Sequence, residues 1–271
     1  ELKMKKNIFM FIVLNVFLSG ALSAHEWFGA IGDVKDYKAG DTVPVYSYST
    51  HHLIAGEWIP RPGGFYVLQN NTLNDVKITT VPNQTLNVLA QSFTLPGGAP
   101  CLVLLNSMAR FSNVTTSGNK EATKATIKAL GLTVTKTYIS EDWCKIYINP
   151  TSQDSSFAKP LGLPLEITPV TNPADIAAGK SAVFKVLLHG QPLSGAAVSA
   201  TYRNYNPKDQ DAWAVKDAKT DAAGLITINI PNSAAAKDIW IVKTLYSGDV
   251  KNNPVYDAES YNSWVSFTVN K

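Results

Sequence analysis

The segment TDAAGLITINIP, Thr220–Pro231, decides the fold class of this chain. It opens with an Asp-x-x-Gly turn, Asp221–Gly224, and then alternates strictly, so that one set of positions carries Ile226, Ile228 and Ile230. A period of two residues puts alternate side chains on opposite faces of a β-strand. The segment therefore predicts a turn that leads into a strand with one apolar face.

The surrounding sequence repeats this pattern on both sides. Apolar, β-branched runs separated by turn residues predict further strands at Leu165–Ile167, Val183–Leu188, Ala197–Tyr202, Ile239–Leu245 and Trp264–Val269. Several short strands at regular spacing are typical of an immunoglobulin-like or transthyretin-like sandwich. We therefore expect residues 156–271 to form a carboxy-terminal β-sandwich domain.

Residues 25–155 also read mainly as strands. These are predicted at 42–48, 65–68, 76–81, 86–89, 102–105 and 132–148. One short helix is expected from about Lys120 to Leu130, with Gly131 as its stop. The polar, proline-containing segment Asn149–Pro164 is predicted to link the two parts. The expected fold is mainly all-β, with two β-sandwich-like domains.

Residues 1–24 have the three parts of a secretory signal peptide. Lys5 and Lys6 precede an apolar run, Ile8–Leu18, and a small-residue site follows from Ala21 to Ala24. Cleavage there would leave His25 as the first residue, so the sequence predicts a periplasmic or secreted protein.

The exported portion would be nearly neutral, with 21 basic and 20 acidic residues once Lys3, Lys5, Lys6 and Glu1 are removed. It contains no basic run with interleaved aromatic residues, so nucleic acid is not an expected partner.

Cys101 and Cys144 both fall in the exported portion. In an oxidising compartment, two cysteines at this spacing favour a disulfide, which would stabilise the fold by about 4 kcal/mol in the chain-entropy model. Two buried free thiols are the alternative. Neither cysteine lies in a C-x-x-C motif, so a zinc ribbon or redox site is not expected.

Histidines at two places suggest a metal site. After cleavage, His25 would carry a free α-amine beside its imidazole, and these two nitrogens can chelate one ion as in a histidine brace. His51 and His52 lie in a loop-like segment rich in proline and glycine, and imidazole nitrogens suit Ni, Co, Cu and Zn. Glu57 could supply an oxygen ligand or orient an imidazole as an acceptor. Solvated surface histidines are the alternative interpretation.

His189 stands in the segment LLHGQPLSGA before a glycine, a position that favours residues able to adopt positive φ. We expect a turn former there rather than a ligand. The motifs H-E-x-x-H, G-x-S-x-G, Walker A and G-x-G-x-x-G are all absent from the sequence, so no enzyme is predicted. An adhesin or carbohydrate-binding protein that uses its tryptophans and tyrosines is the rival class, and a copper-dependent oxidative enzyme is a third.

Four segments together resemble a known family. They are AHEWF at Ala24–Phe28, THHLIAGEW at Thr50–Trp58, the run from Gly162 to Tyr202 and TDAAGLITINIP. In these segments the chain resembles an extracytoplasmic family of domains of unknown function that is associated with nickel and cobalt uptake by energy-coupling-factor transporters.

The resemblance implies an accessory metal-binding protein whose cargo is Ni or Co and whose partner is a membrane metal transporter. The nitrogen donors keep Cu as the alternative cargo. His25 matches the leading histidine of the family, and either His51 or His52 matches its loop histidine. The histidine-rich tracts that family members often carry are absent from this sequence.

Overall fold

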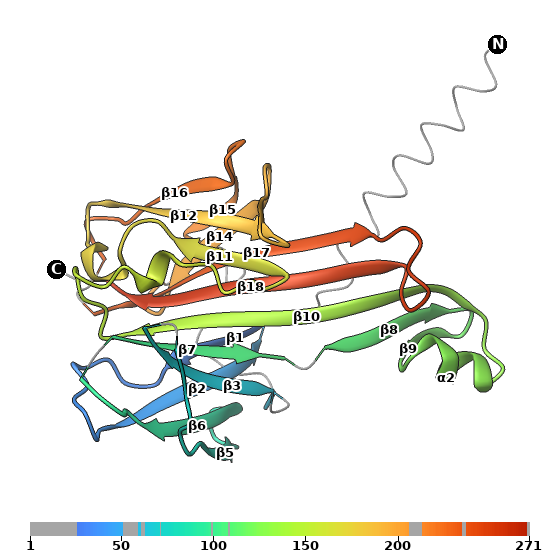
Figure 1. The fold of residues 1–271 in the computed structure, drawn as a ribbon, viewed down its shortest axis with the longest axis horizontal. Coiled ribbons are helices and arrows are strands. Elements are labelled where there is room, and N and C mark those ends of the chain that lie inside the picture. The colour runs from blue at the N-terminus through green and yellow to red at the C-terminus, as the bar shows by residue number, and fades with distance from the viewer. Residues whose placement is uncertain are drawn as a thin grey trace, which may run out of the picture.

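The computed structural model describes residues 26–50, 59–60, 63–70, 72–98, 100–107, 109–205, 213–234 and 237–269. Over these ranges the chain forms three β-sheets, and the predicted all-β, sandwich-like fold is confirmed (Figure 1). The described ranges contain one α-helix, α2 (Lys124–Ala129), and two short 3-10 helices, η1 (Ser156–Ala158) and η2 (Pro173–Asp175).

We name the sheets by their position. The amino-terminal sheet has the order β1 (Glu26–Ile31), β2 (Thr42–Thr50), β6 (Val88–Thr94) and β5 (Thr79–Asn83). The carboxy-terminal sheet contains β11 (Leu165–Pro169), β12 (Ser181–Leu188) and β13 (Gln191–Pro192), with β16 (Leu225–Asn229) paired to β12.

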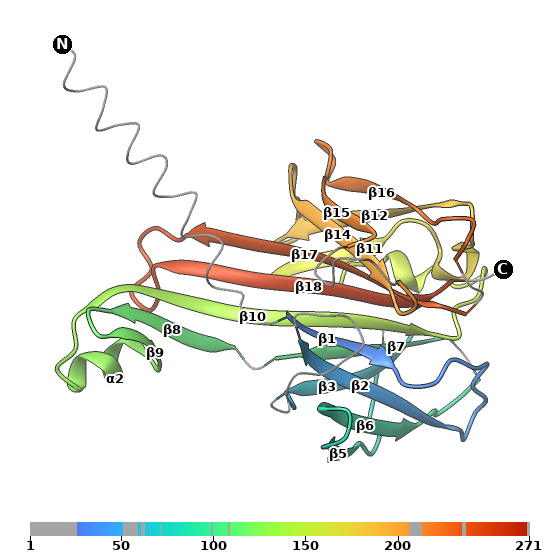
Figure 2. The same cartoon turned by 180° about the vertical axis from the view of Figure 1, so that it is seen from behind.

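The central sheet lies between these two (Figures 1 and 2). Its order is β15 (Val215–Lys219), β14 (Ala197–Tyr202), β17 (Ile239–Asp249), β18 (Ala258–Thr268), β10 (Val134–Ile148), β7 (Cys101–Asn106), β3 (Gly64–Gln69) and β4 (Thr72–Asn74). Off this path, β8 (Arg110–Thr115) pairs with β10 and with β9 (Gly118–Glu121).

The central sheet joins the two parts of the chain that the sequence was expected to separate. Strand β10 pairs in parallel with β18, from Tyr138 opposite Ala258 to Ile146 opposite Ser266. The predicted boundary at residues 155 and 156 falls between β10 and β11, but hydrogen bonds of one sheet cross between the two parts. The two sandwiches therefore share their middle layer.

Alternation along the central strands supplies both hydrophobic cores. In β18, Val265 and Phe267 belong to the core beneath the carboxy-terminal sheet, while Trp264 belongs to the core beneath the amino-terminal sheet. In β17, Trp240 belongs to the core beneath the carboxy-terminal sheet and Ile241 to the core beneath the amino-terminal sheet. Because successive side chains point to opposite faces, one strand can serve two cores only if it is apolar on both faces.

The turn and strand predicted at Thr220–Pro231 are confirmed. The Asp221 carboxylate accepts hydrogen bonds from the backbone N–H groups of Ala223 and Leu225, both at 2.8 Å. Gly224 adopts φ +73°, a left-handed conformation that favours glycine. The three isoleucines of the alternating segment are all buried, at 8%, 1% and 2% exposure for Ile226, Ile228 and Ile230.

The helix is shorter than predicted. Residues 118–121 pair with β8 as strand β9, and helix α2 begins only after Thr123, whose side chain accepts from the N–H of Thr126. Pairing of residues 118–121 with β8 therefore overrides the helical pattern at the start of the predicted helix. The predicted stop at Gly131 is confirmed by its φ of +74° and by its N–H bond to Lys128 O.

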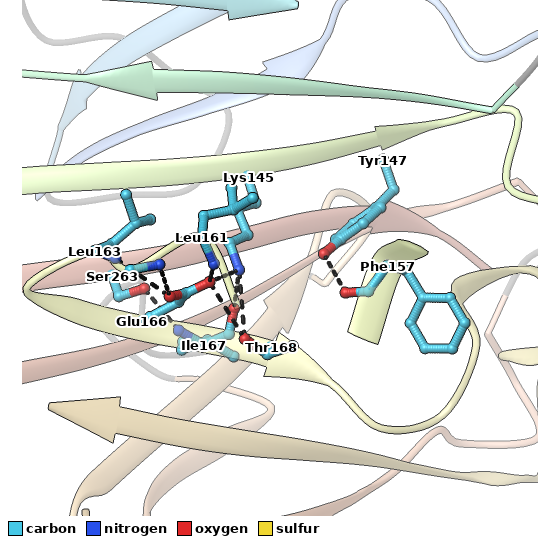
Figure 3. A network of polar contacts seen from close by, with 10 residues as sticks. Lys145, Tyr147, Phe157, Leu161, Leu163, Glu166, Ile167, Thr168 and Ser263 are labelled. Carbon is cyan, nitrogen blue, oxygen red and sulfur yellow. Dashed lines mark hydrogen bonds and ion pairs between the residues drawn. The ribbon is translucent and has the colours of Figure 1, made fainter. Parts of the chain in front are cut away.

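A buried ion pair fastens β11 to the central sheet (Figure 3). The Lys145 ammonium lies 2.5 Å from Glu166 Oε1 and also donates to the carbonyl of Ile167 at 3.1 Å. The Glu166 carboxylate accepts from the backbone N–H groups of residues 161, 162 and 163 as well. Burial lowers the pKa of Lys145, and the Glu166 charge opposes this shift. The pair is stable because its polar atoms have partners.

Replacing Lys145 with Met should lower the free energy of unfolding by about 3–5 kcal/mol, because Glu166 is then left charged and buried without its cation. Urea denaturation monitored by circular dichroism measures this loss. The matched control is Lys136→Met, which breaks the pair with Asp249, whose side chain is 74% exposed. Its expected cost is about 0–1 kcal/mol, and equal losses in the two variants would contradict the assignment.

Candidate metal centre

The amino-terminal sheet brings together the two chain positions from which the predicted ligands extend. Strands β1 and β2 are antiparallel, with Glu26 opposite Thr50 and Trp27 opposite Ser49. His25 precedes Glu26 in the sequence, and His51 follows Thr50. The predicted ligands His25, His51 and His52 and the predicted acceptor Glu57 lie outside the described residues.

Strand β1 lies close against the central sheet at Gly29. The Gly29 N–H donates to Cys144 Sγ at 3.3 Å, and the Cys144 thiol donates back to Gly29 O at 3.4 Å. A Cβ atom at residue 29 would lie 2.3 Å from Leu105 Cδ1. Glycine therefore permits this close approach of β1 to β7 and β10, since a larger residue would have to displace the buried Leu105 side chain.

An aromatic cluster packs beside Gly29, between strands β1 and β2 and the central sheet. Phe28 stacks on Tyr48 with ring centroids 5.0 Å apart, and it contacts Trp264 of the central sheet at 5.4 Å. Trp213 contacts Trp264 in turn, at 6.4 Å. Both Phe28 and Trp264 are 2% exposed. The paired ends of β1 and β2 therefore rest on a packed base.

A lysine that the sequence analysis did not single out belongs to this cluster. The Lys243 ammonium lies 4.3 Å from the ring centroid of Trp213 and 5.4 Å from that of Trp264. Burial lowers the pKa of Lys243 to about 8. The sequence signal for this residue is a lysine inside the otherwise apolar strand segment IWIVKTL, which indicates a buried ammonium. Its ammonium is poised to change charge near neutral pH.

His189 lies on the other side of the central sheet from β1. It lies in the turn between β12 and β13 with φ +49°, as expected of a turn former. The carboxy-terminal sheet covers the face of the central sheet opposite to β1 (Figure 2).

The predicted disulfide between Cys101 and Cys144 is wrong, because both residues are buried free thiols. Cys101 pairs with Ile148, four residues along β10 from Cys144. At the usual strand rise this separates the two Cα atoms by about 13 Å, beyond the roughly 7 Å that a disulfide can span. Burial raises the pKa of each thiol to about 12, so neither is a ready thiolate ligand.

Among the residues that the structure describes, no group of three or more His, Cys, Asp and Glu side chains is arranged to hold a metal ion. His25, His51 and His52 lie outside these described residues. No helix in the described ranges is long and apolar enough to span a membrane.

A family described as "Domain of unknown function (DUF4198)" matches residues 22–248. The chain belongs to this family. The match begins just before His25 and includes the histidine loop and most of both cores. No curated protein matches this DUF4198 chain.

Two solved structures show weak similarity to the DUF4198 chain. The D0-D1 domain of intimin is 9% identical with a TM-score of 0.23, and the alignment covers 88% of this chain and 96% of that one. The ectodomain of mouse nectin-like molecule 4 is 8% identical with a TM-score of 0.18, covering 90% of this chain and 64% of that one. At these TM-scores, neither structure informs the function.

Replacing Trp213 with alanine should raise the pKa of the Lys243 ammonium. In Trp213→Ala, water reaches the ammonium, so its pKa should rise from about 8 toward the ordinary lysine value. Titration of the lysine side-chain NMR signals measures this. Trp143→Ala, which removes a tryptophan of the opposite face, should leave the pKa of Lys243 unchanged. An unchanged pKa in Trp213→Ala would contradict burial by that ring.

The lowered pKa also fixes the sign of a pH effect. Between about pH 8 and 10 the unfolded chain binds a proton at this lysine that the folded chain has lost. Lys243 should therefore make the free energy of unfolding increase with pH in this window. Lys243→Met should remove that part of the slope, as measured by urea denaturation at several pH values.

The two free thiols can be counted directly. A disulfide-exchange reagent should titrate two thiols per chain in denaturant and react far more slowly with the folded protein, because Cys101 and Cys144 are 3% and 0% exposed. Protein isolated from an oxidising compartment is the appropriate sample. A count of zero thiols in denaturant would restore the disulfide prediction.

Proposed function

We propose that this DUF4198 protein binds a divalent transition-metal ion outside the cytoplasm, Ni or Co first and Cu next, and passes it to a membrane transporter. The ligands are the α-amine and imidazole of His25 together with His51 or His52. Glu57 acts as the acceptor that orients an imidazole. The role is that of a binding protein and involves no catalytic step.

The observation that carries this proposal is the register of β1 and β2. Glu26 and Thr50 are directly opposite, and His25 and His51 are their immediate neighbours in the chain. Paired Cα atoms are about 4.5–5.5 Å apart and consecutive ones 3.8 Å, so covalent geometry keeps the Cα atoms of residues 25 and 51 within about 13 Å. Two histidines so tethered can reach one ion without folding back a long loop.

The support beneath this end of the sheet favours the same function. The close contact at Gly29 and the packed rings of Phe28, Tyr48 and Trp264 hold the last paired residues in place. Metal sites gain affinity when their ligands extend from such a rigid base, because less ordering is needed on binding.

Donor chemistry favours the borderline divalent metals. An amine and imidazoles form a nitrogen donor set, which suits Ni, Co, Cu and Zn better than Mg or Ca. The family resemblance of the histidine segments supports nickel or cobalt and a transporter as recipient. The matched family description itself assigns no function.

Calorimetry on a chain that begins at His25 tests the proposal. Separate titrations with Ni²⁺, Co²⁺ and Cu²⁺ should each reveal a site that requires the free amino terminus. A chain that retains one extra residue before His25 should bind at least about tenfold more weakly, because the amine no longer chelates with the His25 imidazole. Affinity should also fall from pH 8 to pH 6, as protons compete for the amine and imidazoles.

The variants His51→Ala and His52→Ala identify the loop ligand, since only the ligand's removal should weaken binding. Circular dichroism of each variant serves as the folding control. Affinity that is indifferent both to the extra residue and to the two alanine variants would refute the proposed ligand set.

A further inference from the structure

A second set of polar side chains lies on the face of the central sheet that carries the carboxy-terminal sheet. His189, in the turn after β12, places Nε2 3.1 Å from Glu259 Oε1 at the start of β18. The Tyr261 hydroxyl donates to the other carboxylate oxygen, Oε2, at 3.1 Å. His189 and Tyr261 therefore both contact the Glu259 carboxylate, one at each oxygen.

Burial and packing orient this group toward solvent. The Glu259 side chain is 10% exposed, whereas the His189 side chain is 52% exposed. The Tyr261 ring meets the imidazole edge to face, with centroids 5.8 Å apart. The carboxylate is thus fixed from below, and the imidazole above it is accessible to solutes.

The Nε2 to Oε1 distance is close to that of two ligands on one metal ion. Nitrogen and oxygen ligands at about 2.0–2.2 Å in a tetrahedral arrangement lie roughly 3.3 Å apart. At the observed 3.1 Å an ion would lie beside the line between the two atoms, so the exposed imidazole must turn to direct Nε2 toward it. The Tyr261 hydroxyl then provides the outer hydrogen bond that commonly holds a ligating carboxylate.

A further carboxylate adds negative charge on the same face. Glu141 lies opposite Tyr261 in the β10 and β18 register and is half-buried. Its charge contributes to the raised pKa of Tyr261, after burial and Glu259. The described residues include no three-ligand cluster here, so water must complete the coordination. Affinity should therefore be lower than at a closed site.

We infer that His189 and Glu259 form a second binding site for a borderline divalent transition-metal ion such as Zn²⁺ or Ni²⁺, with Tyr261 orienting the carboxylate. One imidazole nitrogen and one carboxylate oxygen select this class of ion over alkaline-earth ions. The inference does not depend on the proposed function, since it uses none of the residues of the His25 site.

The test uses the full exported chain carrying His25→Ala, His51→Ala and His52→Ala, so that none of the proposed amino-terminal imidazole ligands remains, titrated by calorimetry with Zn²⁺ and, separately, Ni²⁺. This background should retain a binding event that His189→Asn abolishes. Asparagine is chosen because it tolerates the positive φ of residue 189 and so preserves the turn. Glu259→Gln, of the same size, should weaken binding by at least about tenfold, because the ligand charge is lost.

Imidazole ¹⁵N NMR supplies an independent readout. Zn²⁺ should shift the ring-nitrogen signals of His189 in the background chain, and the same shift in Glu259→Gln should need at least about tenfold more Zn²⁺. Binding heats that persist in His189→Asn, or His189 signals that do not respond to Zn²⁺, would overturn the inference and leave the contact as a fastening of the turn. Failure of the His25 site alone would appear in the unsubstituted chain, as the absence of binding that depends on a free amino terminus, and would leave the His189 result unchanged.

Discussion

The parallel pairing of β10 with β18 is the constraint on which the rest of this structure depends. It joins strands that the chain visits more than a hundred residues apart and makes one sheet out of both parts of the molecule. Where the two outer sheets cover it, this sheet has no solvent face. Its residues must therefore be apolar on alternate positions toward two different cores, as Trp264 and Val265 are.

Two buried charged groups of β10, Lys145 and Asp142, are tolerated because each has hydrogen-bond partners. Lys145 is neutralised by Glu166, and Asp142 accepts from Asn262 at 2.6 Å and from Ser107 at 3.0 Å. Ser107 follows the end of β7, where β10 exchanges β7 for β8 as its neighbour. The side-chain bonds of Asp142 thus secure the sheet where the ladder on that edge of β10 is interrupted.

The two faces of the central sheet carry different chemistry. On one face, the contact at Gly29 and the aromatic cluster hold the paired ends of β1 and β2, which lead to the histidines of the proposed metal site. On the other, the turn after β12 brings His189 onto Glu259. The middle layer separates the described ends of β1 and β2 from His189, and the two proposed sites share no residue, so they can be tested separately by substitution.

The sequence by itself determined the local features: the strands, the Asp221–Gly224 turn, the stop at Gly131 and the turn role of His189. These follow from side-chain period and backbone conformation, which depend on near neighbours in the chain. It also pointed to His25 and the histidine pair as ligands, which remain a prediction. Only the tertiary structure decided the shared central sheet, the free thiols of Cys101 and Cys144, and the partners of Lys145 and His189. Those depend on the register between distant strands, and register is set by the packing of whole faces rather than by any one segment.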